Sequence, residues 1–149
     1  MSLVIRTVSP ADIGDLLTIE RVAFPGDRLS RRSFQYMARN PKAIFLVAER
    51  DEKPAGYILT LSHKRRTLGR IYSLAVAPEY VGKGIARALL QHCEDEARNR
   101  FLRGLQLEVR NDNQAAIKLY ESSGYTEAGV VDDYYEDGMA ALKFIKLFT

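Results

Sequence analysis

The feature that most constrains the fold is a glycine-containing loop, Gly82-Lys83-Gly84, which joins an apolar run at 70–77 to a helical pattern. Apolar side chains then recur on one helical face, with charged residues opposite, at Ile85, Leu89, Cys93 and Ala97. A second apolar run of strand length follows at 104–109. A strand, a helix and a strand in this order predict a right-handed crossover between two parallel strands.

The remaining apolar runs extend this unit into a mixed central sheet. Short polar turns connect the runs before the loop, which favours antiparallel pairing there. The predicted strands are 3–8, 43–49, 55–62, 70–77, 104–109, 125–131 and 139–147. Helices are expected after the capping residues Ser9 and Ser30, and again at 113–123, where Gly124 ends the helix. We therefore expect an α+β fold in a single domain, 1–149, with an antiparallel N-terminal half, one βαβ unit that carries the glycine loop, and a C-terminal β-hairpin.

The bulk composition narrows the class of protein. With 149 residues, 46% of them hydrophobic, the chain can bury one full core. The formal net charge is only +3, which disfavours a nucleic-acid-binding domain, so we interpret the arginine-rich stretches 28–32 and 64–66 as solvated surface. The lone cysteine, Cys93, rules out an internal disulfide and a multi-cysteine metal site. Because no segment resembles a signal peptide or a membrane span, we expect a cytoplasmic protein without a membrane partner or a metal.

The loop has the properties of an anion-binding site. Glycines let main-chain N–H groups approach an anion closely, and the N-terminus of the following helix adds partial positive charge. Lys83 and Arg87 add full charges. A dinucleotide-binding G-x-G-x-x-G loop is disfavoured because Arg87 occupies the third glycine position, and the Walker pattern G-x-x-x-x-G-K-[ST] is absent. We interpret the loop as a site for a phosphate or pyrophosphate; the alternative is a flexible turn before a helix.

Two motifs resemble the GNAT superfamily of N-acetyltransferases. The first is Val76-Ala77-Pro78-Glu79-Tyr80 followed by Gly82-Lys83-Gly84-Ile85-Ala86-Arg87-Ala88-Leu89-Leu90, which is similar to the acetyl-CoA loop of that family. The second is the segment 113–120, which fits N-x-x-A-x-x-L-Y and is followed by Gly124-Tyr125. The two motifs together, in this order and at this spacing, are specific. Leu107-Glu108-Val109-Arg110 and Tyr134-Tyr135 are also similar to ribosomal-protein alanine N-acetyltransferases.

The resemblance implies acetyl-CoA as co-substrate and assigns residues to it. Main-chain groups of Leu74, Ala75 and Val76 would pair with the pantetheine arm as an added strand does. Asn113 would hydrogen-bond the cofactor, and the pyrophosphate would be held by the main-chain N–H groups of Gly82, Lys83, Gly84, Ile85, Ala86 and Arg87. One position departs from the family. Val81 stands where the family usually has Gln or Arg, so a side-chain donor worth about 1.5–3 kcal/mol is missing.

Transfer of an acetyl group to an amine requires a base for the ammonium, stabilisation of the oxyanion and an acid for the departing thiolate. The resemblance assigns the acid to Tyr120, because a phenol pKa of about 10 lies near that of a thiol. The alternative role of Tyr120 is that of an aromatic core residue. Glu108, at a strand end where a crevice should open, is the candidate base, directly or through a water. Its alternative is a salt bridge, with Arg110 as the expected partner, and the family implies an oxyanion donor in the main chain near Val76.

The acceptor amine has a candidate site in the run 132–137, which is rich in acidic and aromatic residues. Its acids would attract a cationic amine, and the adjacent Tyr134 and Tyr135 indicate a contact surface; the alternative is a solvated polar loop. We therefore expect an enzyme that moves acetyl from acetyl-CoA to a primary amine, either a protein N-terminal amine or a small molecule. The alternative raised by Val81 is a non-catalytic acyl-CoA-binding module. The resemblance also allows a homodimer.

Overall fold

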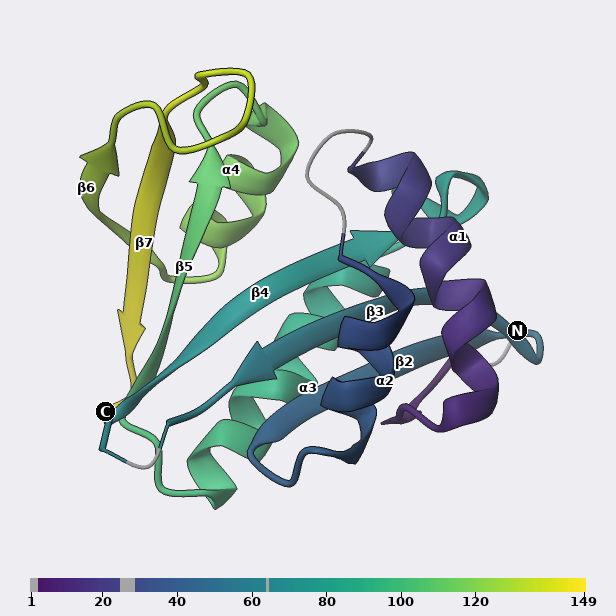
Figure 1. Ribbon diagram of the computed structural model, residues 1–149. Helices are drawn as coiled ribbons and strands as arrows, with labels where there is room; N and C mark the ends of the chain where they lie inside the picture. The colour runs from purple at the N-terminus through teal and green to yellow at the C-terminus, as the bar shows by residue number, and fades with distance from the viewer. Residues whose placement is uncertain (1–2, 25–28, 64) are drawn as a thin grey trace.

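The computed structural model describes residues 3–24, 29–63 and 65–149, and its centre is one seven-stranded sheet (Figure 1). The strands are β1 (Leu3–Thr7), β2 (Ala43–Arg50), β3 (Lys53–Leu61), β4 (Leu68–Val76), β5 (Gly104–Arg110), β6 (Thr126–Val131) and β7 (Ala141–Leu147). The helices are α1 (Ile13–Ala23), α2 (Arg31–Arg39), α3 (Ile85–Asn99) and α4 (Gln114–Ser122), with short 3-10 turns η1 (Pro10–Asp12) and η2 (Pro78–Tyr80). Arg28 and Lys64, from the two arginine-rich stretches, lie outside the described residues.

The strand order is β1-β2-β3-β4-β5-β7-β6, so the last strand lies between β5 and β6. Among the described strands, β4 and β5 are parallel, whereas the pairs on either side of them are antiparallel. The α+β class, the antiparallel N-terminal half, the βαβ unit and the C-terminal hairpin are therefore confirmed.

Polar side chains start two helices where the sequence predicted them. The Ser30 hydroxyl accepts a hydrogen bond from the Ser33 N–H at 3.1 Å and begins α2. Asn113 Oδ1 accepts from the Ala116 N–H at 3.1 Å and begins α4. Each bond satisfies a main-chain donor that has no partner within its own helix.

Helices cover both faces of the sheet, but not all of it. Helices α1 and α2 lie over β2, β3 and β4 on one face, where Phe34 and Tyr57 are fully buried (Figure 1). Helices α3 and α4 lie on the opposite face, over a second cluster that includes Leu89 and Phe144. Among the described residues, the cluster under α1 and α2 contains none from β5, β6 or β7. That face of the C-terminal half of the sheet therefore has no described helix packed on it.

The two halves of the sheet separate between β4 and β5. Their parallel pairing runs from Leu68 opposite Gly104 to Ile71 opposite Leu107, although β4 continues to Val76. A bulge in β4 at the same level leaves Tyr72 without a partner on β3. Past Ile71, the edge of β4 that faces β5 pairs with no described strand, and the two strands diverge (Figure 1).

A buried ion pair joins α3 to the C-terminal hairpin. Glu94, which is 2% exposed, accepts hydrogen bonds from Lys146 Nζ and from the Tyr125 hydroxyl, each at 2.9 Å. Lys146 also donates to the Ser123 carbonyl at 2.8 Å, next to the end of α4. Burial, together with the charge of Glu94, raises the pKa of Tyr125. These bonds fix the position of α4, and with it the position of Tyr120, relative to α3.

Candidate active site

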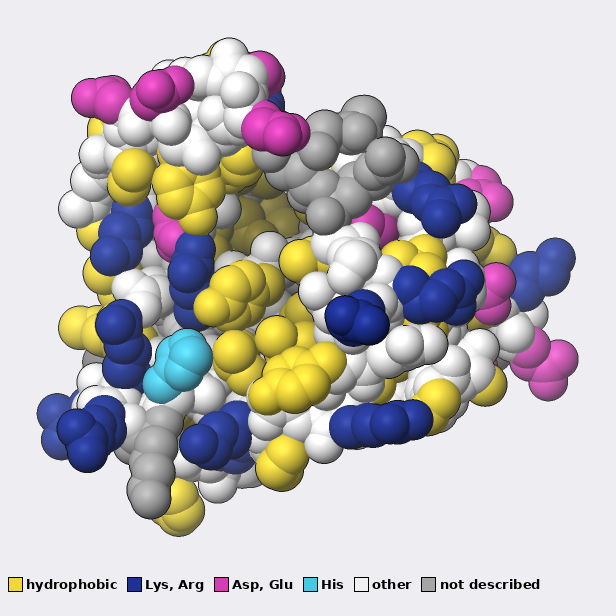
Figure 2. Space-filling model, viewed as in Figure 1, with side chains coloured by type: hydrophobic (Ala, Val, Ile, Leu, Met, Phe, Trp, Pro, Cys, Tyr) yellow, Lys and Arg dark blue, Asp and Glu magenta, His cyan; other side chains and the backbone are white. Residues whose placement is uncertain are grey.

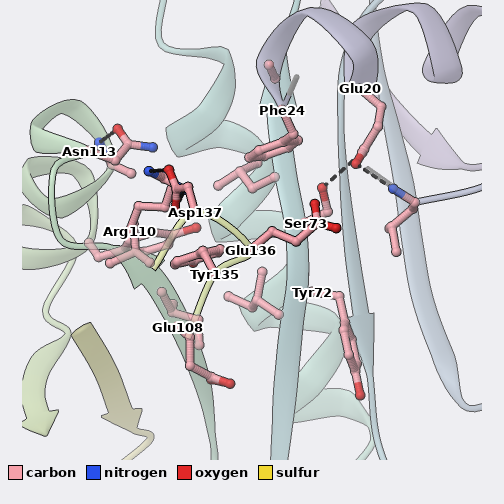
Figure 3. Close-up of a pocket in the computed structure, with 18 residues that line it drawn as sticks. Glu20, Phe24, Tyr72, Ser73, Glu108, Arg110, Asn113, Tyr135, Glu136 and Asp137 are labelled. Atoms are coloured by element: carbon pink, nitrogen blue, oxygen red, sulfur yellow. Dashed lines mark hydrogen bonds and ion pairs between the residues drawn. The ribbon is translucent and has the colours of Figure 1, made fainter. Parts of the chain in front are cut away.

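A cleft of ≈ 580 Å³ lies where β4 and β5 diverge (Figure 3). One wall carries Glu20 and Phe24 from α1, and the other carries residues of β5 and of the β6–β7 loop. Five residues that the sequence predicted for the site line this one space: Leu74, Glu108, Asn113, Tyr120 and Tyr135. Tyr134 reaches the site through Glu108, whereas the glycine loop is not part of the cleft wall.

Tyr120 lies both in the core and in the wall of the cleft, a position compatible with either of its two predicted roles. Its ring is 6% exposed and packs edge-on against Tyr125, with centroids 5.5 Å apart, so it belongs to the core. It also lines the cleft. Burial, the largest cause, raises the pKa of the Tyr120 phenol. The hydroxyl therefore keeps its proton at neutral pH and can act as a donor toward the cleft.

Glu108 forms a salt bridge, but the expected partner was wrong. Its Oε1 lies 2.5 Å from Arg70 Nη2 of β4, and the Tyr134 hydroxyl donates to the same oxygen at 3.4 Å. Arg70 also donates to Tyr134 Oη at 2.8 Å and lies 4.7 Å from the ring centre of Tyr72. Arg70 thus holds together β4, β5 and the loop of the C-terminal hairpin at the mouth of the cleft.

The expected partner of Glu108, Arg110, points to other acids. Its guanidinium lies 2.7 Å from Asp137 Oδ2 and 3.1 Å from Asp112 Oδ1. It also stacks 4.9 Å from the ring centre of Tyr135. The pKa of Asp137 is lowered, first of all by its hydrogen bond from Arg110. The β6–β7 loop, which carries Tyr135, is therefore fastened to the end of β5.

Sequence reasoning missed Glu20, a buried carboxylate on the α1 wall. Glu20 is 1% exposed and accepts hydrogen bonds from the Tyr57 hydroxyl and, at 3.0 Å, from the Leu29 N–H. Ser73 Oγ lies 3.3 Å from the same carboxylate. The available signal was an acid in the apolar helical spacing of Ile13, Leu16 and Leu17, since a charge on a core-facing position needs partners. Through these contacts, Glu20 joins α1 to β3, to β4 and to Leu29, which lies just before α2.

The glycine loop lies beside the cleft, at the N-terminus of α3. Gly82 and Gly84 have φ values of 84° and 79°, in the left-handed region that favours glycine. The Ile85 side chain is buried, so only its main chain can contact a ligand. Arg87 donates to Ser122 Oγ at 2.8 Å and thereby joins α3 to the end of α4. Val81 is 66% exposed, and its side chain offers no hydrogen bond.

Within residues 3–24, 29–63 and 65–149, no group of three or more His, Cys, Asp or Glu side chains is placed to hold a metal ion. Nor does any helix in those ranges have the length and apolar character needed to cross a membrane.

Comparison with known proteins gives a consistent result. A model of the acetyltransferase (GNAT) family matches residues 13–125. The chain is 48% identical to the [Ribosomal protein bS18]-alanine N-acetyltransferase of Escherichia coli K12 over 65 residues, so the match spans only 44% of each protein. It is 35% identical to an N-acetyltransferase of Methanocaldococcus jannaschii over 145 residues, which are 97% of this chain and 91% of that protein.

A solved structure extends the comparison to the fold. The crystal structure of the ribosomal-protein-S18-alanine N-acetyltransferase from Escherichia coli superposes with a TM-score of 0.87 at 29% identity. The superposition covers 99% of this chain and 95% of that one. The extent of the family match and the shared fold agree with the two motifs recognised in the sequence. The chain belongs to the acetyltransferase (GNAT) family.

Proposed function

We propose that this protein is an acetyl-CoA-dependent N-acetyltransferase whose acceptor is the α-amine at the N-terminus of a protein. The observation that carries the proposal is the cleft between β4 and β5, because one space holds a buried phenol, Tyr120, and a carboxylate, Glu108. These are the proton donor and the proton acceptor that acetyl transfer to an amine requires. Membership of the family supports the same class of reaction.

The edge of β4 that faces β5 has free main-chain groups that can bind the substrate acetyl-CoA. Past Ile71 this edge is unpaired toward β5, so the amides of a pantetheine arm can pair with the main chain of Leu74, Ala75 and Val76. Farther on, α3 is 15 residues long, and its N-terminus can hold a pyrophosphate through main-chain N–H groups of the loop 82–87. Oδ1 of Asn113 caps α4, which leaves the Nδ2 amide of that side chain as the donor to the cofactor.

The chemistry follows from these positions. Glu108, through a water, takes a proton from the acceptor ammonium, and the free amine attacks the thioester carbon. A main-chain N–H near Val76 stabilises the oxyanion. When the C–S bond breaks, Tyr120 donates its proton to the sulfur, so that CoA leaves as a thiol, and the nitrogen loses its second proton to water. Solvent then takes the proton from Glu108 and returns one to the phenol. The Arg70 ion pair keeps Glu108 facing the cleft mouth, where a water can reach it.

The Glu108→Gln variant should have a kcat/KM about 10- to 100-fold below that of the wild type, because amide nitrogen and oxygen cannot take the proton. Steady-state kinetics over a pH range test this, and the pH–rate profile should differ from that of the wild type. Glu127→Gln is the control, since Glu127 is an exposed carboxylate on β6 that does not line the cleft. Equal losses in the two variants, or an unchanged pH profile, would remove Glu108 from the mechanism.

Val81 is the position that favours the second candidate function, a module that binds acyl-CoA without transfer. We expect the Val81→Arg variant to bind CoA about 3- to 10-fold more tightly, because it restores a charged donor to an exposed position of the loop. Calorimetric titration measures this. Val130→Arg is the control, since Val130 is 55% exposed on β6, away from the loop. Equal affinity in Val81→Arg and wild type would mean that a side chain at this position does not reach the pyrophosphate.

Acetyl transfer to a set of peptides with different N-termini, and to small amines, tests the proposal itself. Transfer to peptide α-amines supports it. Turnover of small amines alone would favour a small-molecule acetyltransferase, and CoA binding without any transfer would favour the module. The relation to ribosomal-protein acetyltransferases supports a cytoplasmic location, which we include in the proposal. The homodimer stays a prediction, which light scattering on the purified protein can test.

A further inference from the structure

One face of the sheet beyond the cleft has no described helix packed on it. It consists of the outward side of β5 and β7 and the start of β4, opposite α3, and we name it the open half-sheet. Register places Arg70, Gln106 and Ile145 in one row across it, and Glu108 and Lys143 in the next. The intervening residues of β5 are buried on the side of α3.

The open half-sheet is accessible and partly apolar. Ile145 is half-buried, and Leu147 and Tyr72 are 65% and 40% exposed. Figure 2 shows yellow side chains in the hollow of the cleft and just below it. A polypeptide that leaves the cleft on this side therefore meets a surface on which its main chain and apolar side chains can rest.

Basic and acidic side chains lie at opposite ends of this surface. Arg70 and Lys143 lie on the open half-sheet, and Arg65 and Arg66 are exposed in the β3–β4 turn at its lower end. The one acid in the two rows, Glu108, is already paired with Arg70. Acids gather instead at the opposite end, in the β6–β7 loop. Figure 2 shows this division, with magenta side chains along the top of the molecule and dark blue ones over the lower left.

We infer that the acceptor is a polypeptide with a positively charged N-terminus followed by acidic residues, which lie on the open half-sheet. The inference rests on the proposed function. The acidic loop attracts the ammonium, and Lys143 together with the exposed Arg65 and Arg66 attracts carboxylates, so the polarity of the surface fixes the direction of the chain. From Lys143 to Leu147 the sheet extends about 13 Å, which matches roughly four residues of extended peptide. The acidic residues are therefore expected at roughly the third to sixth positions of the acceptor.

Three peptides that share their first two residues and carry Asp, Gln or Lys at the next four positions test this inference on the full-length protein. We expect kcat/KM to be at least about tenfold higher for the Asp peptide than for the Lys peptide at low salt. The preference should come mainly from KM and should shrink as salt is added, since screening weakens contacts between exposed charges.

The Lys143→Glu variant tests whether the preference for the Asp peptide over the Lys peptide comes from charge complementarity. It should lower the Asp-to-Lys preference about fivefold or more, and Arg65→Glu, farther from Glu108, should lower it in the same direction. The ratio between peptides is the readout, because a change in the chemical step alone affects all three peptides equally. Lys53→Glu, in an exposed position next to the β2–β3 turn, makes the same change of charge elsewhere and should leave the ratio unchanged.

The outcomes distinguish a failure of the proposed function from a failure of this inference. If no peptide is acetylated, the proposed function fails and this inference fails with it. If all three peptides are acetylated equally well, the proposed function stands and this inference is wrong. An RNA oligonucleotide is included as a competitor. Inhibition by RNA together with equal use of the three peptides would mean that Lys143, Arg65 and Arg66 bind nucleic acid, and it would overturn the inference.

Discussion

Replacing Tyr120 with phenylalanine is expected to lower kcat by about 100-fold or more, while the affinity for CoA changes by less than about twofold. The ring keeps its packing against Tyr125 and Phe144, so the core and the cleft wall are preserved. Only the hydroxyl is lost, and with it the proton that would go to the departing sulfur. Steady-state kinetics give kcat, and calorimetric titration gives the affinity for CoA.

Tyr125→Phe is a matched control for this experiment. Tyr125 is the other ring of the same edge-on pair, but its hydroxyl donates to Glu94 inside the protein rather than toward the cleft. Its loss should lower the free energy of unfolding by about 1–2 kcal/mol and leave kcat within a fewfold of wild type. If Tyr120→Phe retained full turnover, or if both variants lost kcat equally, Tyr120 could not be the acid.

Replacing Glu20 with alanine is expected to lower the free energy of unfolding by about 3 kcal/mol. Three groups would lose their carboxylate partner, namely the hydroxyls of Tyr57 and Ser73 and the main-chain N–H of Leu29. Burial, the largest cause, raises the pKa of Tyr57, so its hydroxyl remains a donor in need of an acceptor. Denaturant unfolding, followed by circular dichroism, measures the change.

Asp15→Ala is the control for Glu20→Ala, because Asp15 lies on the same helix but is exposed to solvent. It should change the free energy of unfolding by less than about 0.5 kcal/mol. Similar stabilities for the two variants would show that the hydrogen bonds accepted by Glu20 contribute little to the stability of the fold.

The sequence predicted the parts of the fold that depend on local patterns. The glycine loop and the helical spacing after Ile85 are set by nearby residues, so the βαβ unit could be read from the chain. Asn113 likewise caps its own helix. The same patterns carry the family motifs, from which Tyr120 and Glu108 were predicted as site residues, and both line the cleft.

The residues that the sequence did not reveal depend on contacts between distant segments. Arg70 and Glu108 are 38 positions apart and meet because β4 and β5 lie side by side before they diverge. Arg110 was expected to pair with Glu108, two residues away, but Asp137 comes closer after the C-terminal hairpin folds back. The divergence itself follows a bulge at Tyr72, and no local pattern of residue types marks a bulge of this kind.

The early end of pairing between β4 and β5 has an energetic consequence. A ligand that adds itself to β4 displaces no strand, so none of its binding energy is consumed in separating backbone partners. The polar edge is already exposed before the ligand arrives, and each round of the reaction can begin and end without local unfolding. Among the described strands, β4 thus keeps a place for one more partner, and under the proposed function acetyl-CoA would fill it.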